Sequence, residues 1–119
     1  MPTQVFETFN PNFKTTFQAL ADAPLNYTTS FKAKTKILYV LLKASEAITE
    51  TVTVTFNCGN GASYDVVLDS VAIVAGTNYY YNFDGKDFML RDVDELTITC
   101  TNNNVTGTVY VIVGAETKR

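Results

Sequence analysis

The sequence predicts an all-β protein: an antiparallel β-sandwich of immunoglobulin-like or jelly-roll type with seven to nine short strands. Apolar and polar residues alternate with a period of two in several segments, and β-branched threonine and valine are abundant in them. Glycine, asparagine and aspartate cluster between these segments, as they do in turns. With 119 residues, the chain has the length of one domain that can bury a core without metals or disulfides.

Three segments alternate strictly. In residues 51–56, Val52 and Val54 face one way and the threonines face the other. Residues 96–101 and 109–113 repeat this pattern, so each of the three strands is expected to have one face on a core. Further strands are predicted at residues 25–31, 36–44, 64–68, 71–75, 79–83 and 88–90.

The N-terminal residues 1–24 differ from the predicted β-sandwich domain, residues 25–119. Four phenylalanines lie three, four and four residues apart in this segment: Phe6, Phe9, Phe13 and Phe17. Two interpretations follow. The segment is a short helix whose aromatic stripe caps the sandwich, or an extended arm whose rings dock on a neighbouring subunit. In both, the rings are expected to be covered rather than left in water.

The composition excludes several kinds of chemistry. The chain has no histidine, which rules out imidazole bases, histidine-containing catalytic triads and histidine-ligated metal sites. The formal net charge of −3 weighs against binding to a nucleic-acid backbone. The longest apolar run, residues 37–42, is too short to span a bilayer, and the first thirty residues contain no secretion signal. We therefore expect a protein made in a cytosol, with no enzymatic activity, no cofactor, no nucleic-acid partner and no membrane partner.

The cysteines and the acidic clusters are expected to be structural. Cys58 and Cys100 are in phase with inward-facing residues and should be small core side chains, although a disulfide between them stays open. The clusters at residues 84–87 and 91–95 have no EF-hand spacing, so turn formation and solubility explain them better than calcium binding.

The strand at residues 79–83 is rich in aromatic residues. Alternation places Tyr79, Tyr81 and Phe83 on one face and Tyr80 on the other. These rings either pack in the core and at its rim or form a platform for a sugar or a protein partner. The absence of tryptophan weighs against the sugar platform.

Apolar residues exceed what one two-layered domain of this size buries. Residues 36–44 are apolar on both faces, and the last strand carries apolar residues opposite its inward valines. The surplus predicts contacts with another copy or with a partner. The candidate contact residues are Phe6, Phe9, Phe13, Phe17, Leu38, Tyr39, Tyr80, Tyr110 and Ile112.

Five segments carry a resemblance to a known class of protein: residues 36–40, 47–55, 61–70, 94–99 and 107–111. Over about residues 36–115, the chain resembles small β-sandwich virion structural proteins of tailed bacteriophages. The resemblance implies a capsid cement or decoration protein that contacts the major capsid protein and itself. It further implies a homo-oligomer, with a trimer favoured and a dimer next, located in the virion after synthesis in the bacterial host cytoplasm. The alternatives are a head–tail connector or tail subunit, and a carbohydrate-binding module that uses the tyrosine-rich strand.

Overall fold

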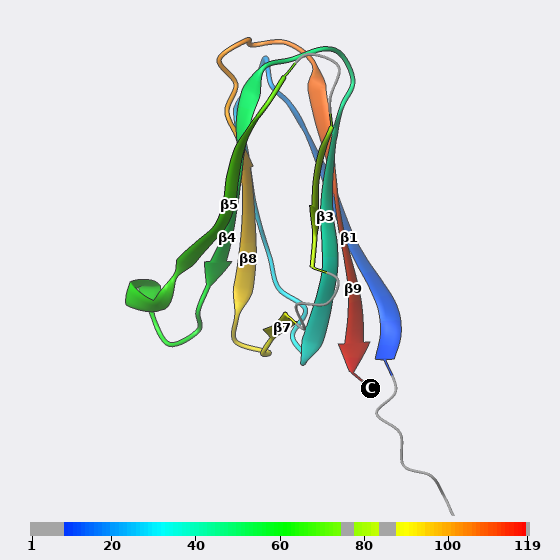
Figure 1. Cartoon of the computed structure of the whole chain (residues 1–119), viewed down its shortest axis with the longest axis vertical. Helices are drawn as coiled ribbons and strands as arrows, with labels where there is room; N and C mark the ends of the chain where they lie inside the picture. The colour runs from blue at the N-terminus through cyan, green and yellow to red at the C-terminus, as the bar shows by residue number, and fades with distance from the viewer. Residues whose placement is uncertain (1–8, 75–77, 84–87, 119) are drawn as a thin grey trace, which may run out of the picture.

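The computed structural model describes residues 9–74, 78–83 and 88–118, and it confirms the predicted antiparallel β-sandwich. Nine strands lie within the described residues: β1 (Phe9–Ala19), β2 (Leu25–Thr29), β3 (Thr35–Ala44), β4 (Glu50–Asn57), β5 (Val66–Ile73), β6 (Tyr79–Asn82), β7 (Met89–Leu90), β8 (Glu95–Cys100) and β9 (Thr108–Lys118). A single 3-10 turn, η1 (Ala62–Tyr64), interrupts the connection from β4 to β5. Figure 1 shows the two layers, with β4, β5 and β8 on one side and β1, β3 and β9 on the other.

The strand order decides between the two predicted topologies. One sheet has the order β1-β9-β3-β6, with β7 also paired to β3, and the other has the order β2-β8-β4-β5. The pairs are therefore nested: β1 with β9, β2 with β8, β3 with β6, and β4 with β5. This nesting is that of a jelly roll. An immunoglobulin-like sandwich is excluded because its first two strands share a sheet, whereas β1 and β2 lie in different sheets.

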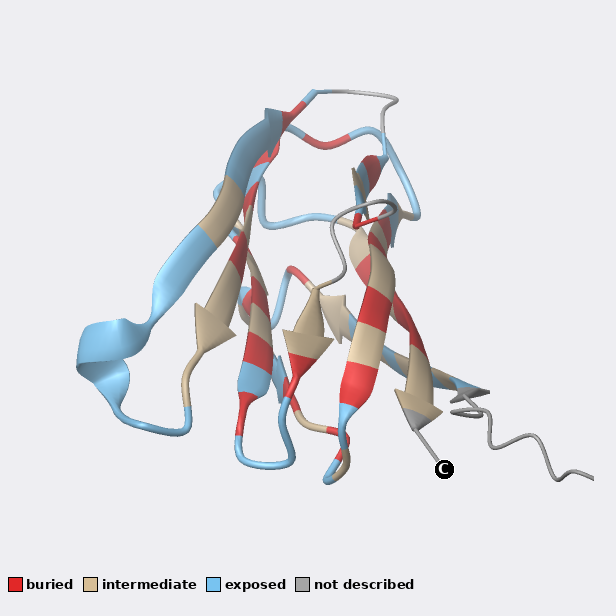
Figure 2. Cartoon of the chain, turned by 60° about the horizontal axis from the view of Figure 1, so that its bottom comes forward, coloured by how far each residue is buried: buried red, intermediate tan, exposed pale blue. Residues whose placement is uncertain are grey.

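The core lies between the sheets and follows the predicted alternation. Val52 and Val54 of β4 are completely buried, as are Leu96 and Ile98 of β8. In Figure 2, buried bands alternate with partly buried ones along several strands, whereas most of β5 and η1 is exposed. Packing of the inner faces of both sheets therefore supplies the hydrophobic stabilisation of the fold.

The N-terminal segment is part of the sandwich over the residues described. β1 pairs antiparallel with β9 along its whole length, from Phe9 opposite Lys118 to Ala19 opposite Thr108. The helical interpretation is therefore wrong for residues 9–19. The extended interpretation gave the right conformation, but the strand docks on its own sheet, so the boundary at residues 24 and 25 separates β1 from β2 rather than an arm from a domain. Phe6 lies outside the described residues.

A bulge in β3 determines which of its apolar residues face inward. The register with β9 shifts between Ile37 and Tyr39, so Leu38 is the extra residue. Ile37 and Val40 are both fully buried although they differ in parity, and Tyr39 faces outward. A second bulge lies in β5, where Leu68 is the extra residue between the partners of Val54 and Thr55. β5 is one continuous strand in place of the two strands predicted at 64–68 and 71–75. It begins only at Val66, because Tyr64 belongs to η1.

Candidate functional site

The outer side of the β1-β9-β3-β6 sheet is rich in aromatic residues. Residues that pair across neighbouring strands share a face, and the register brings outward side chains of four strands together. We call this surface the aromatic face. Its members are Phe13, Thr15 and Phe17 of β1, Tyr110 and Ile112 of β9, Tyr39 and Leu41 of β3, and Tyr80 of β6.

Two rings at one end of the aromatic face form an exposed pair, which we call the ring pair. Phe17 lies directly opposite Tyr110, and their ring centroids are 6.2 Å apart. The exposed fractions of the two residues are 69% and 48%. Such cross-strand aromatic pairs stabilise a sheet by roughly 0.2–1 kcal/mol. About half or more of the surface of each residue nevertheless stays in contact with water.

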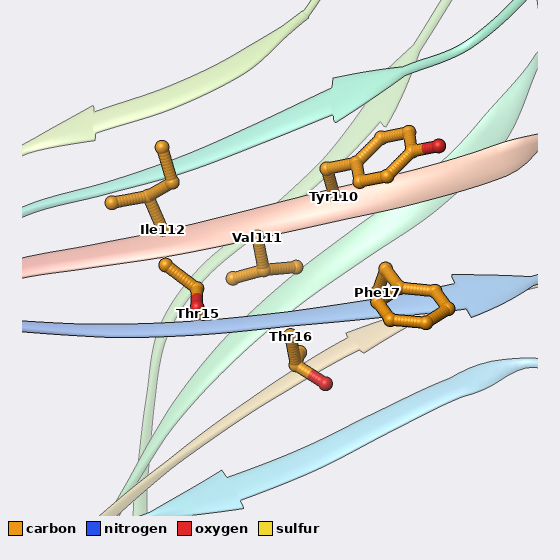
Figure 3. Close-up of a pocket in the computed structure, with 6 residues that line it drawn as sticks. All are labelled: Thr15, Thr16, Phe17, Tyr110, Val111 and Ile112. Atoms are coloured by element: carbon orange, nitrogen blue, oxygen red, sulfur yellow. The ribbon is translucent and has the colours of Figure 1, made fainter.

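A groove lies beside the ring pair. It has a volume of about 460 Å³ and is lined by the ring pair and by Thr15, Thr16, Val111 and Ile112. In the close-up of Figure 3, Phe17 and Tyr110 stand on one side of the groove, and Thr15 and Ile112 stand on the other. Thr15 lies opposite Ile112 in the register, so the face drops from two rings to two smaller side chains within one step along the strands. We call Thr15 and Ile112 the step.

A second aromatic pair lies on the other side of the step. The ring centroids of Tyr39 and Tyr80 are 5.8 Å apart, and Tyr80 is 56% exposed. Tyr39 lies flat on β9 because its neighbour there is Gly114. A Cβ atom at that position would come within 2.2 Å of the Tyr39 ring. The glycine thus lets the tyrosine cover the sheet, and the step remains a low region between two aromatic ridges.

The charged residues of this sheet side stand near its two ends. Lys43 is exposed and lies opposite Tyr110 in the register. Glu116 lies between Pro11 and Lys36 at the opposite end of β9. An apolar centre with charges at the margin is the usual composition of a protein–protein interface.

The structure brings most of the predicted contact residues together. Phe13, Phe17, Tyr39, Tyr80, Tyr110 and Ile112 lie on the aromatic face. Leu38 is half-buried at the bulge, where its carbonyl accepts a hydrogen bond from the Phe83 backbone amide. The backbone of Phe9 belongs to β1, but its side chain and all of Phe6 lie outside the described residues. Thr15 and Leu41 also lie on this face; they were not predicted as contact residues, although their outward direction follows from the phase of their neighbours.

The aromatic platform of a carbohydrate-binding module does not exist on β6. Tyr79 is 3% exposed, and its hydroxyl donates a 2.7 Å hydrogen bond to Asp69 Oδ2 in β5. Burial and this carboxylate raise the pKa of Tyr79 well above its usual range. Phe83 is buried as well, and Tyr81 packs edge-on against it. The three rings belong to the core side, so the platform on which the carbohydrate-binding alternative depends is absent from this face of the strand.

Asp94 is a buried carboxylate that organises the loops at one end of the sandwich. It is 2% exposed and accepts hydrogen bonds at 2.9 Å from the backbone amides of Gly59 and Arg91. The Arg91 guanidinium donates two more, at 2.9 and 3.0 Å, in a bidentate pair. Hydrogen bonding to the Arg91 guanidinium is the largest cause that lowers the pKa of Asp94, and the backbone hydrogen bonds add to it. Together they hold this pKa well below its usual range, although burial alone would raise it. The expectation of turn chemistry therefore fits Asp94.

Glu50 plays the same part at the opposite end. Its carboxylate accepts hydrogen bonds from the Thr101 hydroxyl at 2.6 Å and from the backbone amides of Asn103 and Asn104 at 2.9 and 2.7 Å. Burial raises its pKa, but the three hydrogen bonds together lower it below the ordinary value. This role of Glu50 was not predicted from the sequence. The alternation does indicate that both carboxylates face inward, because Glu50 is in phase with Val52 and Val54, as Asp94 is with Leu96 and Ile98.

The two cysteines are free thiols in different surroundings. Cys100 is buried as predicted, and burial raises its pKa to about 11. Cys58 lies just beyond β4 and is half-buried, with its sulfur 3.4 Å from Arg91 Nη2, so its predicted place in the core is wrong. Among the residues that the structure describes, no group of acidic or cysteine side chains could hold a metal ion, and no helix is long and apolar enough to cross a membrane. Residues 84–87, the other acidic cluster, lie outside that part of the chain.

Comparison with known proteins gives one structural match. No protein-family model and no curated protein matches the chain. The chain is similar to a crystal structure of the Drosophila NLP core, which is described as giving insight into pentamer formation and histone binding. The two chains share 19% sequence identity with a TM-score of 0.46, over 87% of this chain and 97% of the fly chain. At this similarity, neither the assembly nor the partner of the fly protein is transferred to the present chain.

The comparisons nevertheless correct the expected identity. They return no phage virion protein, and the solved structure that they do return is a fly protein of another kind. The interpretation as a capsid cement or decoration protein is wrong, and so are the connector and tail alternatives. The major capsid protein as partner, the trimer inferred from capsid symmetry, and a location in a virion or a bacterial host are withdrawn with it.

Proposed function

We propose that this chain is a non-enzymatic subunit that associates with further copies of itself through the aromatic face. The observation that carries the proposal is the ring pair beside an open groove, on a sheet whose inner side already forms the core. Large aromatic side chains grouped on one exposed surface lose unfavourable contact with water when a second surface covers them. Aromatic residues are also the side chains that contribute most to binding energy at interfaces.

The titratable groups support a structural rather than a catalytic role. The two buried carboxylates, Asp94 and Glu50, are each committed to several hydrogen bonds that fix loop backbone. Both have lowered pKa values, whereas a general acid at neutral pH needs a raised one. Their arrangement explains the order of the loops without any substrate.

The test removes the ring pair without touching the core. Phe17→Ser combined with Tyr110→Ser should abolish self-association, because both side chains are exposed and neither supports the inner face. Sedimentation velocity of the full chain at about 1 to 500 μM measures the result, a range that covers weak and moderate affinities. Wild-type chain should sediment faster as its concentration rises, and the double variant should stay a monomer.

Tyr64→Ser is the matched control for this experiment. Tyr64 is an equally exposed aromatic residue, 62% exposed, but it lies in η1 on the connection within the other sheet. Its loss should leave the sedimentation of the wild type unchanged. A wild-type chain that is monomeric at every concentration, or a ring-pair variant that sediments like wild type, would contradict the proposed function.

A further inference from the structure

We propose that a small organic anion with an apolar body binds in a pocket at the end of the sandwich remote from the ring pair. We call this pocket the end pocket. Its volume is about 420 Å³, within the range of about 300–1,000 Å³ that is usual for small-molecule sites. β7 and the start of β3 lie at this end, at the bottom of Figure 1, whereas the ring pair is level with Lys43 near the end of β3. The lining residues are Lys32, Ala33, Lys34, Met89, Leu90, Arg91 and Asp92.

The two walls of the end pocket are held together by strand pairing. One wall is the connection between β2 and β3, and the other is β7 with the turn that follows it. Thr35 is fully buried and pairs with Leu90, and its hydroxyl donates a 3.0 Å hydrogen bond to the Ala33 carbonyl. The Ile37 amide donates a further bond of 2.9 Å to the Phe88 carbonyl. The pocket is therefore preformed, so a ligand does not have to order these walls when it binds.

Positive charge gathers at the rim of the end pocket. Lys32 and Lys34 are both exposed, and neither ammonium group has an ion-pair or hydrogen-bond partner in the described part of the chain. Asp92 is the single carboxylate among the described residues that line the pocket. The rim is thus net positive in a chain whose formal net charge is −3, so the rim attracts anions although the molecule as a whole does not.

Arg91 adds hydrogen-bond donors rather than free charge. Its Nε and Nη2 atoms donate to the Asp94 carboxylate at 3.0 and 2.9 Å, which offsets much of the charge and fixes the plane of the guanidinium. Nη2 also donates to Asn60 Oδ1 at 3.2 Å. No described residue accepts a hydrogen bond from Nη1, so its two N–H groups stay available to a carboxylate or phosphate oxygen of a ligand.

The remaining lining residues are apolar, which indicates an organic ligand rather than a bare ion. Leu90 is 1% exposed, and Met89 is half-buried beside it. Ala33 adds a methyl group to the opposite wall, and the aliphatic stems of the lysines extend such surfaces. An apolar pocket with a few convergent polar groups is the usual composition of a small-molecule site. A ring or short alkyl group that carries a carboxylate or phosphate matches both halves of the end pocket.

The backbone of Lys32 gives independent support for a role of its side chain. Its φ of 57° lies in the left-handed region, where a residue with a Cβ is strained and where glycine or asparagine is less so. Strained backbone of this kind clusters at binding sites, because the surrounding structure must hold it in place. A lysine at this position is explained when its charge is used.

The experiment titrates the isotope-labelled full chain with phenyl phosphate and follows the backbone amide resonances by NMR. The amides of Lys34 and Arg91 should shift, with a Kd of about 1 mM or below, which is the affinity usual for a ligand of this size. Inorganic phosphate supplies only the charge and benzyl alcohol only the ring, so each should bind at least about tenfold more weakly. The amides of Thr16 and Val111 report on the groove beside the ring pair and should not shift with phenyl phosphate.

Three single variants locate the anion. Lys34→Gln and Lys32→Asn should each weaken the binding of phenyl phosphate by about threefold, and the two combined by about tenfold. Asparagine suits the left-handed backbone at position 32, so this variant should fold as well as wild type. Lys43→Gln is the matched control, because it also removes one exposed lysine, but from the opposite end of β3. It should leave the Kd unchanged.

Four outcomes would overturn the end pocket as a ligand site. Phenyl phosphate shifts no amide of the pocket at about 10 mM, or inorganic phosphate binds as tightly, which means that the lysines attract any anion without holding its body. Lys34→Gln and Lys43→Gln weaken binding equally, which means an effect of net charge alone. Shifts confined to Thr16 and Val111 place the ligand at the groove instead. Self-association is tested separately, because Lys32 and Lys34 lie outside the aromatic face.

Discussion

At the scale of single residues, the buried carboxylates are where one atom change has the largest consequence. Asp94 receives four hydrogen bonds, and an amide in its place turns N–H donors toward the Arg91 guanidinium. Asp94→Asn should therefore lower the free energy of unfolding by about 2–4 kcal/mol at neutral pH, measured by urea denaturation. Asp92→Asn, an exposed change two residues away, should alter it by no more than about 0.5 kcal/mol.

The same variant has a defined pH dependence. Because the pKa of Asp94 is lower in the folded chain than in the unfolded one, its contribution is complete above the unfolded value of about 4 and is lost as the pH falls below it. The stability difference between wild type and Asp94→Asn should therefore shrink as the pH is lowered from 5 towards 2. A difference that stays constant over that range would show that the carboxylate charge is not what stabilises these loops.

At the scale of the strands, alternation predicted elements well where one face is apolar and the other polar. β4 and β8 meet that condition, whereas β9 is apolar on both faces at Tyr110 and Ile112. β1 reverses it, because its inward side carries half-buried polar residues: Asn12 bonds to the Thr117 hydroxyl, and the ammonium of Lys14 lies 5.5 Å from the centre of the Phe31 ring. Its phenylalanines at intervals of four share one side of a strand as well as of a helix, so their spacing could not distinguish the two.

The bulge in β3 marks a different limit. When both faces of a strand are apolar, parity does not say which residues face inward, and an extra residue reverses the answer midway. Leu38 was thus a reasonable candidate for the outer side, whereas the structure places it at the bulge. The contact residues on β9 were predictable, because Val109, Val111 and Val113 define the inward phase and leave Tyr110 and Ile112 outward. The pairing of Phe17 with Tyr110 was not, since it depends on strand order.

β5 is an edge strand of the second sheet and exposes apolar residues along it. β5 is the last strand in the order of its sheet and pairs there with β4. Its exposed apolar residues include Val66, Val67 and Val71. Such edges promote pairing between chains, and lysine on an edge suppresses it. Val67→Lys should therefore reduce aggregation during heating, followed by light scattering, while changing the free energy of unfolding by no more than about 0.5 kcal/mol.

The control for this prediction is Val93→Lys. Val93 is exposed to a similar extent, 55% against 58% for Val67, but it lies in the turn before β8 rather than on a sheet edge. It adds the same charge, so an effect of net charge alone would appear in both variants. If the two variants reduce scattering equally, the edge of β5 is not the surface that aggregates.

At the scale of the whole molecule, the nested pairing makes the first and last strands mutually dependent. β1 covers the edge of β9, and Leu20, directly after β1, is completely buried. The Leu20 carbonyl also accepts a hydrogen bond from Asn102. Two distant parts of the sequence therefore close the same sheet, which is why the residues before position 25 cannot be assigned to a separate segment from composition alone.

This dependence predicts that residues 25–119 are not stable by themselves. Removing residues 1–24 deletes β1 and the buried Leu20, whose loss alone is equivalent to about 2–5 kcal/mol of a total that is typically 5–15 kcal/mol. The fragment should melt far below the full chain in circular dichroism or fail to fold.

A synthetic peptide of residues 9–24 should restore the unfolding transition of the fragment by pairing with the open edge of β9, as added strands do on exposed sheet edges. A peptide with Leu20→Asp is the matched control and should restore nothing, because the buried position excludes an unpaired charge. A fragment that melts like the full chain would mean that β1 adds no stability to the sandwich and acts in assembly alone.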